Sequence, residues 1–151
     1  MQLTFIKGSG KMDALRILRA DGSEAQIDCP KQGIIPHDMV HFAVEDVLQA
    51  HGFIHRVAAG EAAAFRMTAE QESDGVERLV EVFQGDGWSG GTTPPADMLA
   101  LYATTCEARR CLPLPVTAQE IDAVRVRIAK LTLAWAEVPI GGQLVLELMA
   151  Q

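Results

Sequence analysis

The segment 23–29 alternates in polarity from one residue to the next, and this alternation constrains the fold more than any other feature. Ala25, Ile27 and Cys29 fall on one side, and the residues between them carry charged or amide side chains. Successive side chains of a β-strand point to opposite faces, so the pattern predicts a strand with one face towards water. The Asp-Gly pair at 21–22 precedes it and favours a tight hairpin turn.

Three further segments predict strands of the same sheet. Segments 2–7 and 12–19 are joined by a Gly-Ser-Gly turn at 8–10, which forms a hairpin and lacks the spacing of a phosphate loop. The last segment, 143–149, places three leucines on one face. It must return to the sheet, because alone it would leave its backbone groups unpaired and its leucines exposed.

Helical periodicity begins where the alternation stops. Thr117 and Glu120 form a capping box, and Thr93 with Pro94 is typical of a cap followed by a first helical residue. We therefore expect an α+β domain over residues 1–151. Its mostly antiparallel sheet of about four strands, a three-stranded N-terminal meander plus the C-terminal strand, would be covered by about four helices. The expected helices cover residues 36–50, 72–84, 94–111 and 117–137.

Two segments are harder to assign. Residues 53–66 are ambiguous, because Gly60 argues against an unbroken helix whereas residues 62–65 favour one. The glycine-rich stretch 85–91 formally contains GxGxxG, but it follows a helical pattern rather than a strand. We interpret it as a loop between helices, in which Trp88 packs back on the protein or lines the mouth of a cleft.

Composition excludes several classes of protein. The net charge of −7 argues against a general nucleic-acid binder and against binding to an anionic membrane surface. No apolar run approaches the roughly 20 residues of a membrane-spanning helix, and no signal peptide is visible. An odd number of cysteines (Cys29, Cys106 and Cys111) without a CxxC pair predicts reduced thiols in a cytoplasmic protein.

The start of the first expected helix carries the clearest candidate site. His37 and His41 lie one turn apart, as do the two metal-binding histidines of an HExxH helix. Asp38 stands where that motif has its catalytic glutamate, so it is the candidate for orienting a ligand or activating water. The helix dipole near His37 favours neutral imidazole, which is the form that binds metal. We therefore predict a divalent metal site, with zinc as the first candidate.

A third ligand is not fixed by spacing. We take Glu45, one further turn along, as the third metal ligand beside His37 and His41. Other carboxylates remain open, although Glu77 falls with Glu81 on what is most simply a solvated helix face. The candidates for the third ligand are Glu45, Glu61, Glu70, Glu72 and Glu77.

A structural interpretation competes with the metal site. Two histidines at the edge of a core can each bond a carbonyl or carboxylate group, and Asp38 can simply favour the helix start. A second pair, His51 and His55, has the same spacing, but Gly52 is expected to end the helix between them.

The segment PHDMVHFAVE resembles the PHDLVHFVVE segment of a set of small uncharacterised bacterial proteins. The resemblance extends loosely to the N-terminal strands and to WAEVPIGGQLVLE near the end. It has no established activity attached to it, so it implies no mechanism. The matching positions are Pro36, His37, Asp38, His41 and Glu45.

Three functions follow from these patterns. The first is a metal-binding protein, extending to a small metal-dependent hydrolase. The second is a non-enzymatic interaction module such as a homodimer, which the mean hydropathy of +0.11 allows. The third is a metal-free pocket in which His37, Asp38 and His41 do acid–base work, although no GxSxG nucleophile elbow accompanies them.

Overall fold

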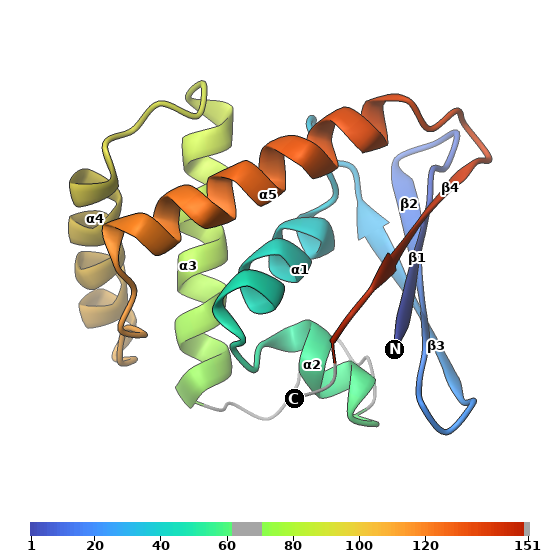
Figure 1. The fold of residues 1–151 in the computed structure, drawn as a ribbon, viewed down its shortest axis with the longest axis horizontal. Coiled ribbons are helices and arrows are strands. Elements are labelled where there is room, and N and C mark those ends of the chain that lie inside the picture. Colours follow the sequence, from blue (N-terminus) through green and yellow to red (C-terminus); the bar gives the residue numbers. More distant parts are fainter. Residues whose placement is uncertain (62–70, 150–151) are drawn as a thin grey trace.

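The computed structural model describes residues 1–61 and 71–149. Within these ranges the chain forms a four-stranded antiparallel sheet and five helices, an α+β fold (Figure 1). The elements in chain order are β1 (Gln2–Ile6), β2 (Met12–Leu18), β3 (Glu24–Pro30), α1 (His37–Leu48), α2 (Phe53–Ala58), α3 (Gln71–Trp88), α4 (Pro95–Arg109), α5 (Ala118–Ala136) and β4 (Gln143–Glu147).

The sheet confirms the meander and the returning C-terminal strand. Its strand order is β3-β2-β1-β4, so β1 lies between β2 and β4, and all neighbours are antiparallel. Phe5 lies opposite Leu15 on one side and Leu144 on the other, which places all three on the same face. Ile27 pairs with Leu15 and joins this face, as the alternation in β3 predicted.

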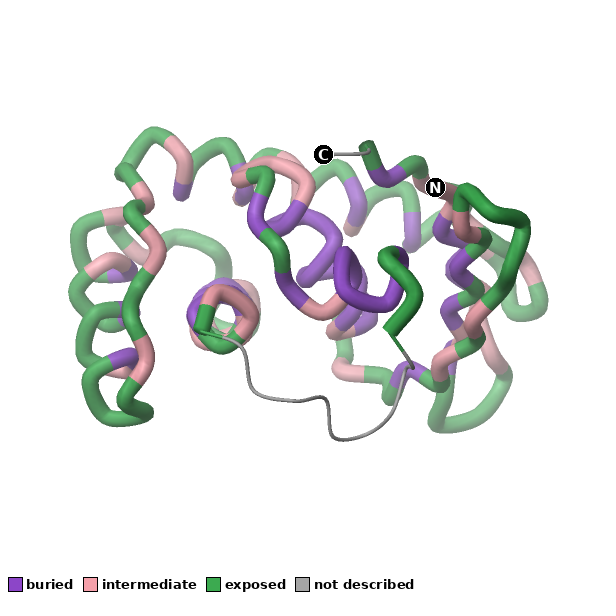
Figure 2. The backbone as a smooth tube through the Cα atoms, turned by 90° about the horizontal axis from the view of Figure 1, so that it is seen from below, coloured by how far each residue is buried: buried purple, intermediate pink, exposed green. Residues whose placement is uncertain are grey.

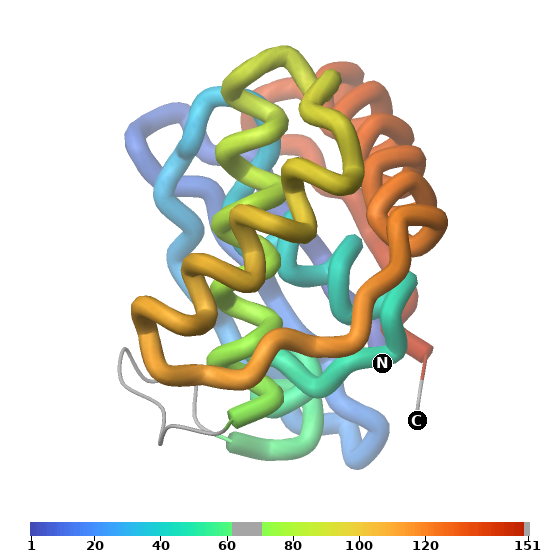
Figure 3. The backbone as a smooth tube through the Cα atoms, turned by 90° about the vertical axis from the view of Figure 1, so that its left-hand side faces the viewer, coloured from blue at the N-terminus to red at the C-terminus, as the bar shows by residue number. Residues whose placement is uncertain are grey.

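The helices cover this apolar face in layers. Figure 1 shows α1 and α2 beside the sheet and α5 running across α3 and α1. Figure 3 shows α4 as the outermost helix, packed against α3. In Figure 2 buried backbone concentrates in α1 and α2, whereas α4 is mostly exposed. Every residue of α1 from Asp38 to Glu45 is buried, so the helix that carries the two histidines lies at the centre of the molecule.

The helix boundaries differ from the sequence-based expectation by one or two residues, except at the end of α3, where the difference is four residues. The loop expected at 85–91 is wrong for its first four residues, because α3 continues to Trp88. Asp86 is held there by Arg125 of α5, and this contact outweighs the low helix propensity of the flanking glycines. The start of α4 is shifted by one residue, because the N-cap is Pro94 and makes no side-chain cap bond.

Other local expectations are confirmed. Thr117 accepts a hydrogen bond from the Glu120 amide at 3.1 Å, and the Glu120 carboxylate accepts one from the Thr117 amide at 3.0 Å. The first part of the ambiguous segment forms α2, whereas the helix considered for 62–65 lies outside the described residues. The three cysteines are free thiols. Among the described helices, none is both long and apolar enough to cross a membrane.

Candidate metal centre

His37 and His41 face α3 from adjacent turns of α1. Their ring centroids lie 4.9 Å apart, with the ring planes at 77°. Residues four apart on a helix lie on one side of it, so two imidazoles at this spacing reach the same point outside the helix. Since α1 and α3 pack together, that point lies at the interface between the two helices.

Glu77 of α3 meets both histidines at this point. Its Oε2 atom lies 2.7 Å from His41 Nε2, and its Oε1 atom lies 3.3 Å from His37 Nε2. The ligand atoms that these three residues offer all lie within 4.8 Å of one another. Ligand atoms about 2.1 Å from a tetrahedral ion lie about 3.4 Å apart, so small side-chain rotations would accommodate one ion.

Glu45 lies behind His41 rather than beside it. Its Oε2 atom is 3.2 Å from His41 Nδ1. When Nδ1–H donates to this carboxylate, Nε2 carries the lone pair and points towards Glu77. Metal-bound histidines commonly donate their second ring nitrogen to a carboxylate in this way. The structure thus brings His37 and His41 together with Glu77, and it places Glu45 as the partner that orients His41.

The Glu45 carboxylate also caps the N-terminus of α2. It is fully buried and accepts hydrogen bonds from the amides of Gly52, Ile54 and His55 at 3.0 to 3.1 Å. These amides lie at the N-terminus of α2, where free N–H groups and the helix dipole favour an anion. His55 Nδ1 lies 2.9 Å from the same carboxylate. Both Glu45 oxygens are therefore engaged within the protein.

Gly52 makes this close approach geometrically feasible. A Cβ atom on Gly52 would lie 2.7 Å from Glu45 Cδ and 2.6 Å from Val76 Cγ1. Such distances are shorter than any normal carbon contact, so only glycine lets the carboxylate lie against the backbone. The helix that carries the first histidine pair has already ended at Leu48.

His37 is oriented from its other side by a neutral group. Gln84 lies two turns beyond Glu77 on α3, and its Oε1 atom is 2.9 Å from His37 Nδ1. Gln84 in turn donates through Nε2 to the side chain of Gln32. When Nδ1–H donates to Gln84, Nε2 of His37 also faces Glu77 with its lone pair.

The carboxylates determine the protonation of the centre. Burial opposes a charge on His41, but its hydrogen bonds to Glu45 and Glu77 outweigh burial and raise its pKa to about 10. Burial likewise opposes a charge on His37, yet the bond to Glu77 leads to a raised pKa. The pKa values of Glu45 and Glu77 are lowered, because their bonds to the histidines outweigh the effect of burial. Without metal, the raised pKa values favour the protonated imidazoles, so the neutral form expected for His37 from the helix dipole is wrong, because the carboxylates have the larger effect. A divalent ion would have to displace the Nε2 protons in order to bind.

Asp38 lies away from this cluster. Its Oδ2 atom accepts a hydrogen bond from the thiol of Cys29 on β3 at 3.0 Å. Burial and the nearby Asp38 charge raise the pKa of Cys29, so the thiol remains protonated and acts as a donor. The position of Asp38 after His37 in the sequence therefore does not place its carboxylate among the ligand atoms.

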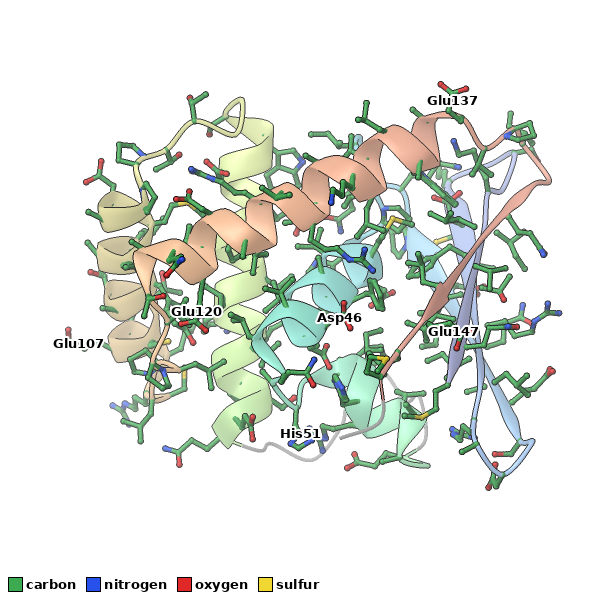
Figure 4. All side chains as sticks on the ribbon, in the orientation of Figure 1. Asp46, His51, Glu107, Glu120, Glu137 and Glu147 are labelled. Atoms are coloured by element: carbon green, nitrogen blue, oxygen red, sulfur yellow. The ribbon has the colours of Figure 1, made fainter. Side chains whose placement is uncertain are left out.

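Two of the remaining candidate ligands have other partners. Glu61 forms an ion pair with Arg56 at 2.9 Å, and Glu72 accepts from the His51 amide at 3.0 Å. Glu70 lies outside the described residues. His51 is exposed, and Figure 4 shows it at the lower edge of the molecule, near α2. In the sequence, Glu77 could be recognised as a candidate only by its position beside the apolar stripe of α3. That stripe does not indicate which helix α3 packs against, so the sequence could not place Glu77 next to the histidines.

No protein-family model, curated protein or solved structure matches this chain. The interpretation of the site therefore rests on its own geometry.

Proposed function

We propose that this protein binds a divalent metal ion through His37, His41 and Glu77. The observation that carries the proposal is the convergence of two imidazole Nε2 atoms on the Glu77 carboxylate, at 3.3 and 2.7 Å. The ligand atoms of the three residues lie within 4.8 Å of one another. Each imidazole also has its Nδ1 atom next to a side-chain oxygen, of Glu45 or of Gln84. This arrangement would hold the metal-binding nitrogens in place before an ion arrives.

The ligand set favours zinc among the common divalent ions. Imidazole nitrogens suit zinc, iron, copper and nickel, whereas calcium and magnesium prefer oxygen ligands. Two histidines and one glutamate are also a set that catalytic zinc sites use, with a fourth position left for water. The side chains of His37 and Glu77 are 25% and 33% exposed, so the fourth position would face solvent.

Hydrolysis of a small substrate is the reaction class that this arrangement would support. Zinc lowers the pKa of a bound water to about 7 and polarises carbonyl or phosphoryl oxygens. The Asp38 carboxylate accepts a hydrogen bond from Cys29, so Asp38 has no role in activating that water. Metal binding is thus the primary proposal, and hydrolysis extends it.

Titration of the metal-free protein with Zn²⁺ and Co²⁺ tests the proposal. We expect one ion per chain, and for Co²⁺ the visible absorption bands of a four-coordinate ion. Glu77→Gln should weaken binding by at least about tenfold, because it removes a charged ligand. Glu81→Gln is the matched control, since Glu81 lies one turn further along α3 and pairs with Arg78. Absence of saturable binding, or equal affinities of the two variants, would contradict the proposal.

A further inference from the structure

A second concave region lies on the other side of Gln84. It is a cavity of about 620 Å³ bounded by the loop before α1, the last turns of α3 with the glycines that follow, and one side of α5. Its wall is mostly aliphatic and aromatic, with Ile35, Val40 and Phe83 at its inner side. Pockets that bury small organic molecules have volumes of roughly 300–1,000 Å³ and walls of this kind.

The rim of this cavity carries exposed apolar side chains. Trp88 and Leu133 are 62% and 72% exposed, and Ile34 and Val126 are also exposed. All four line the cavity. Single exposed apolar residues are normal, but a group of them around one concavity marks a binding surface. Trp88 is also fixed, because its indole N–H donates to the Gln32 carbonyl at 3.1 Å.

The polar groups in the wall already satisfy one another. The Gln84 side chain forms hydrogen bonds with His37 and Gln32. The Arg125 guanidinium donates to both oxygens of Asp86 at 2.9 to 3.0 Å and to the Thr93 carbonyl. The positive and negative charges in the wall are therefore paired, and an ionic ligand would lose its hydration without gaining a free counter-charge.

We propose that this cavity binds an uncharged, largely apolar small molecule, distinct from the metal ion. The volume, the apolar rim and the paired charges of the wall together support this class of ligand. Gln84 links the two sites, because it lines the cavity and its Oε1 atom contacts Nδ1 of His37, whose Nε2 atom meets Glu77. The proposal goes beyond the proposed metal function and does not depend on it.

Binding of Nile red, an uncharged apolar dye, provides the first test. We expect a saturable fluorescence increase with one dye per chain. Displacement by three ten-carbon compounds then reports on charge: decanol, decanoate and decylammonium, each below the concentration at which it aggregates. Decanol should displace the dye at concentrations at least about tenfold lower than either ion, because the wall offers no unpaired charge.

Rim variants locate the dye. Val126→Asp and Leu133→Glu place a charge at the rim and should each weaken dye binding by at least about tenfold. Both side chains are exposed, so the fold should tolerate the changes, which circular dichroism would verify. Leu101→Glu is the matched control, because Leu101 is exposed on α4 and does not line the cavity. Glu77→Gln should bind the dye as the unaltered chain does, which separates this proposal from the metal site.

Several outcomes would overturn the proposal. Absence of saturable dye binding would do so, as would tighter binding of either ion than of decanol. Equal losses in Leu133→Glu and Leu101→Glu would mean that the dye binds elsewhere. Sedimentation velocity would show whether the chain self-associates. If it does and the rim variants abolish the association, the rim is a contact between copies and not a small-molecule site.

Discussion

The two His-x-x-x-His pairs of this chain have the same spacing in the sequence but lie in different structural surroundings. His37 and His41 lie on one unbroken helix, and both rings face a glutamate of a neighbouring helix. His51 lies in a loop and is exposed, whereas His55 lies on the next helix and bonds Glu45. The spacing therefore defines a candidate site only when the helix is continuous and the facing element supplies a third ligand.

Glu45 joins the two pairs, because its carboxylate contacts both His41 and His55. Glu45→Ala would leave three buried amides and two imidazole N–H groups without their acceptor. We expect a loss of about 3–5 kcal/mol in the free energy of unfolding, measured by urea denaturation. Asp46→Ala is the control on the next position, where the side chain pairs with Arg127 at 3.7 Å and is partly exposed. A similar loss in both variants would show that Glu45 has no special role.

Zinc should distinguish the pairs directly. A ligand that binds only the folded state at 100 times its Kd stabilises that state by about 2.7 kcal/mol. We expect Zn²⁺ at that excess to raise the unfolding free energy of the unaltered chain and of His51→Ala by this amount. His37→Ala should show little or no increase. The comparison fails if zinc stabilises His37→Ala as much as it stabilises His51→Ala.

Gly52 separates the pairs in sequence and permits the contact of Glu45 with α2. Gly52→Ala should destabilise the protein by about 1–3 kcal/mol, because its Cβ would overlap Val76 and Glu45. Gly85→Ala is a matched control within α3, since a Cβ there meets nothing within 4 Å. It should be neutral or slightly stabilising, because alanine is the better helix former. Equal unfolding midpoints for the two variants would contradict the close contact.

Asp86 provides an acid-sensitive reference outside both histidine pairs, and its substitution has the smallest expected effect. Burial opposes its ionisation, but bonds from Arg125 and Thr93 outweigh burial and hold its pKa below the usual 3.8. A carboxyl with a lowered folded-state pKa contributes stability above pH 3.8, and loses it as the pH falls through the folded value. The stability difference between the unaltered chain and Asp86→Asn should therefore shrink on acidification below pH 3.8. A difference that grows there would contradict this.

Local patterns predicted most of the fold. The alternation in β3, the Asp-Gly turn and the Thr117 capping box each depend on residues close together in the sequence, and each is confirmed. The return of β4 followed from its otherwise unpaired backbone and exposed leucines. The loop was predicted wrongly because Gly85 and Gly87 have a low helix propensity. The contact that keeps this segment helical, between Asp86 and Arg125, joins residues 39 positions apart, so the local sequence does not reveal it.

Only the part of the candidate site that depends on neighbouring residues in the sequence was predicted. The spacing of His37 and His41 is a local property, and the structure brings these rings together. The choice between Glu45 and Glu77 depends on how α1 packs against α3, which no local pattern records. The partner of Asp38 likewise depends on how α1 meets β3, where Cys29 lies.

The contacts of Glu45 with α2 have a consequence for how the centre assembles. They span only seven to ten residues, whereas Glu77 lies forty residues from His37. Short closures lose less chain entropy than long ones, so one half of the centre can form before the other arrives. A bound ion would then act as a cross-link across that longer segment, tying the stability of the α1–α3 interface to the supply of metal.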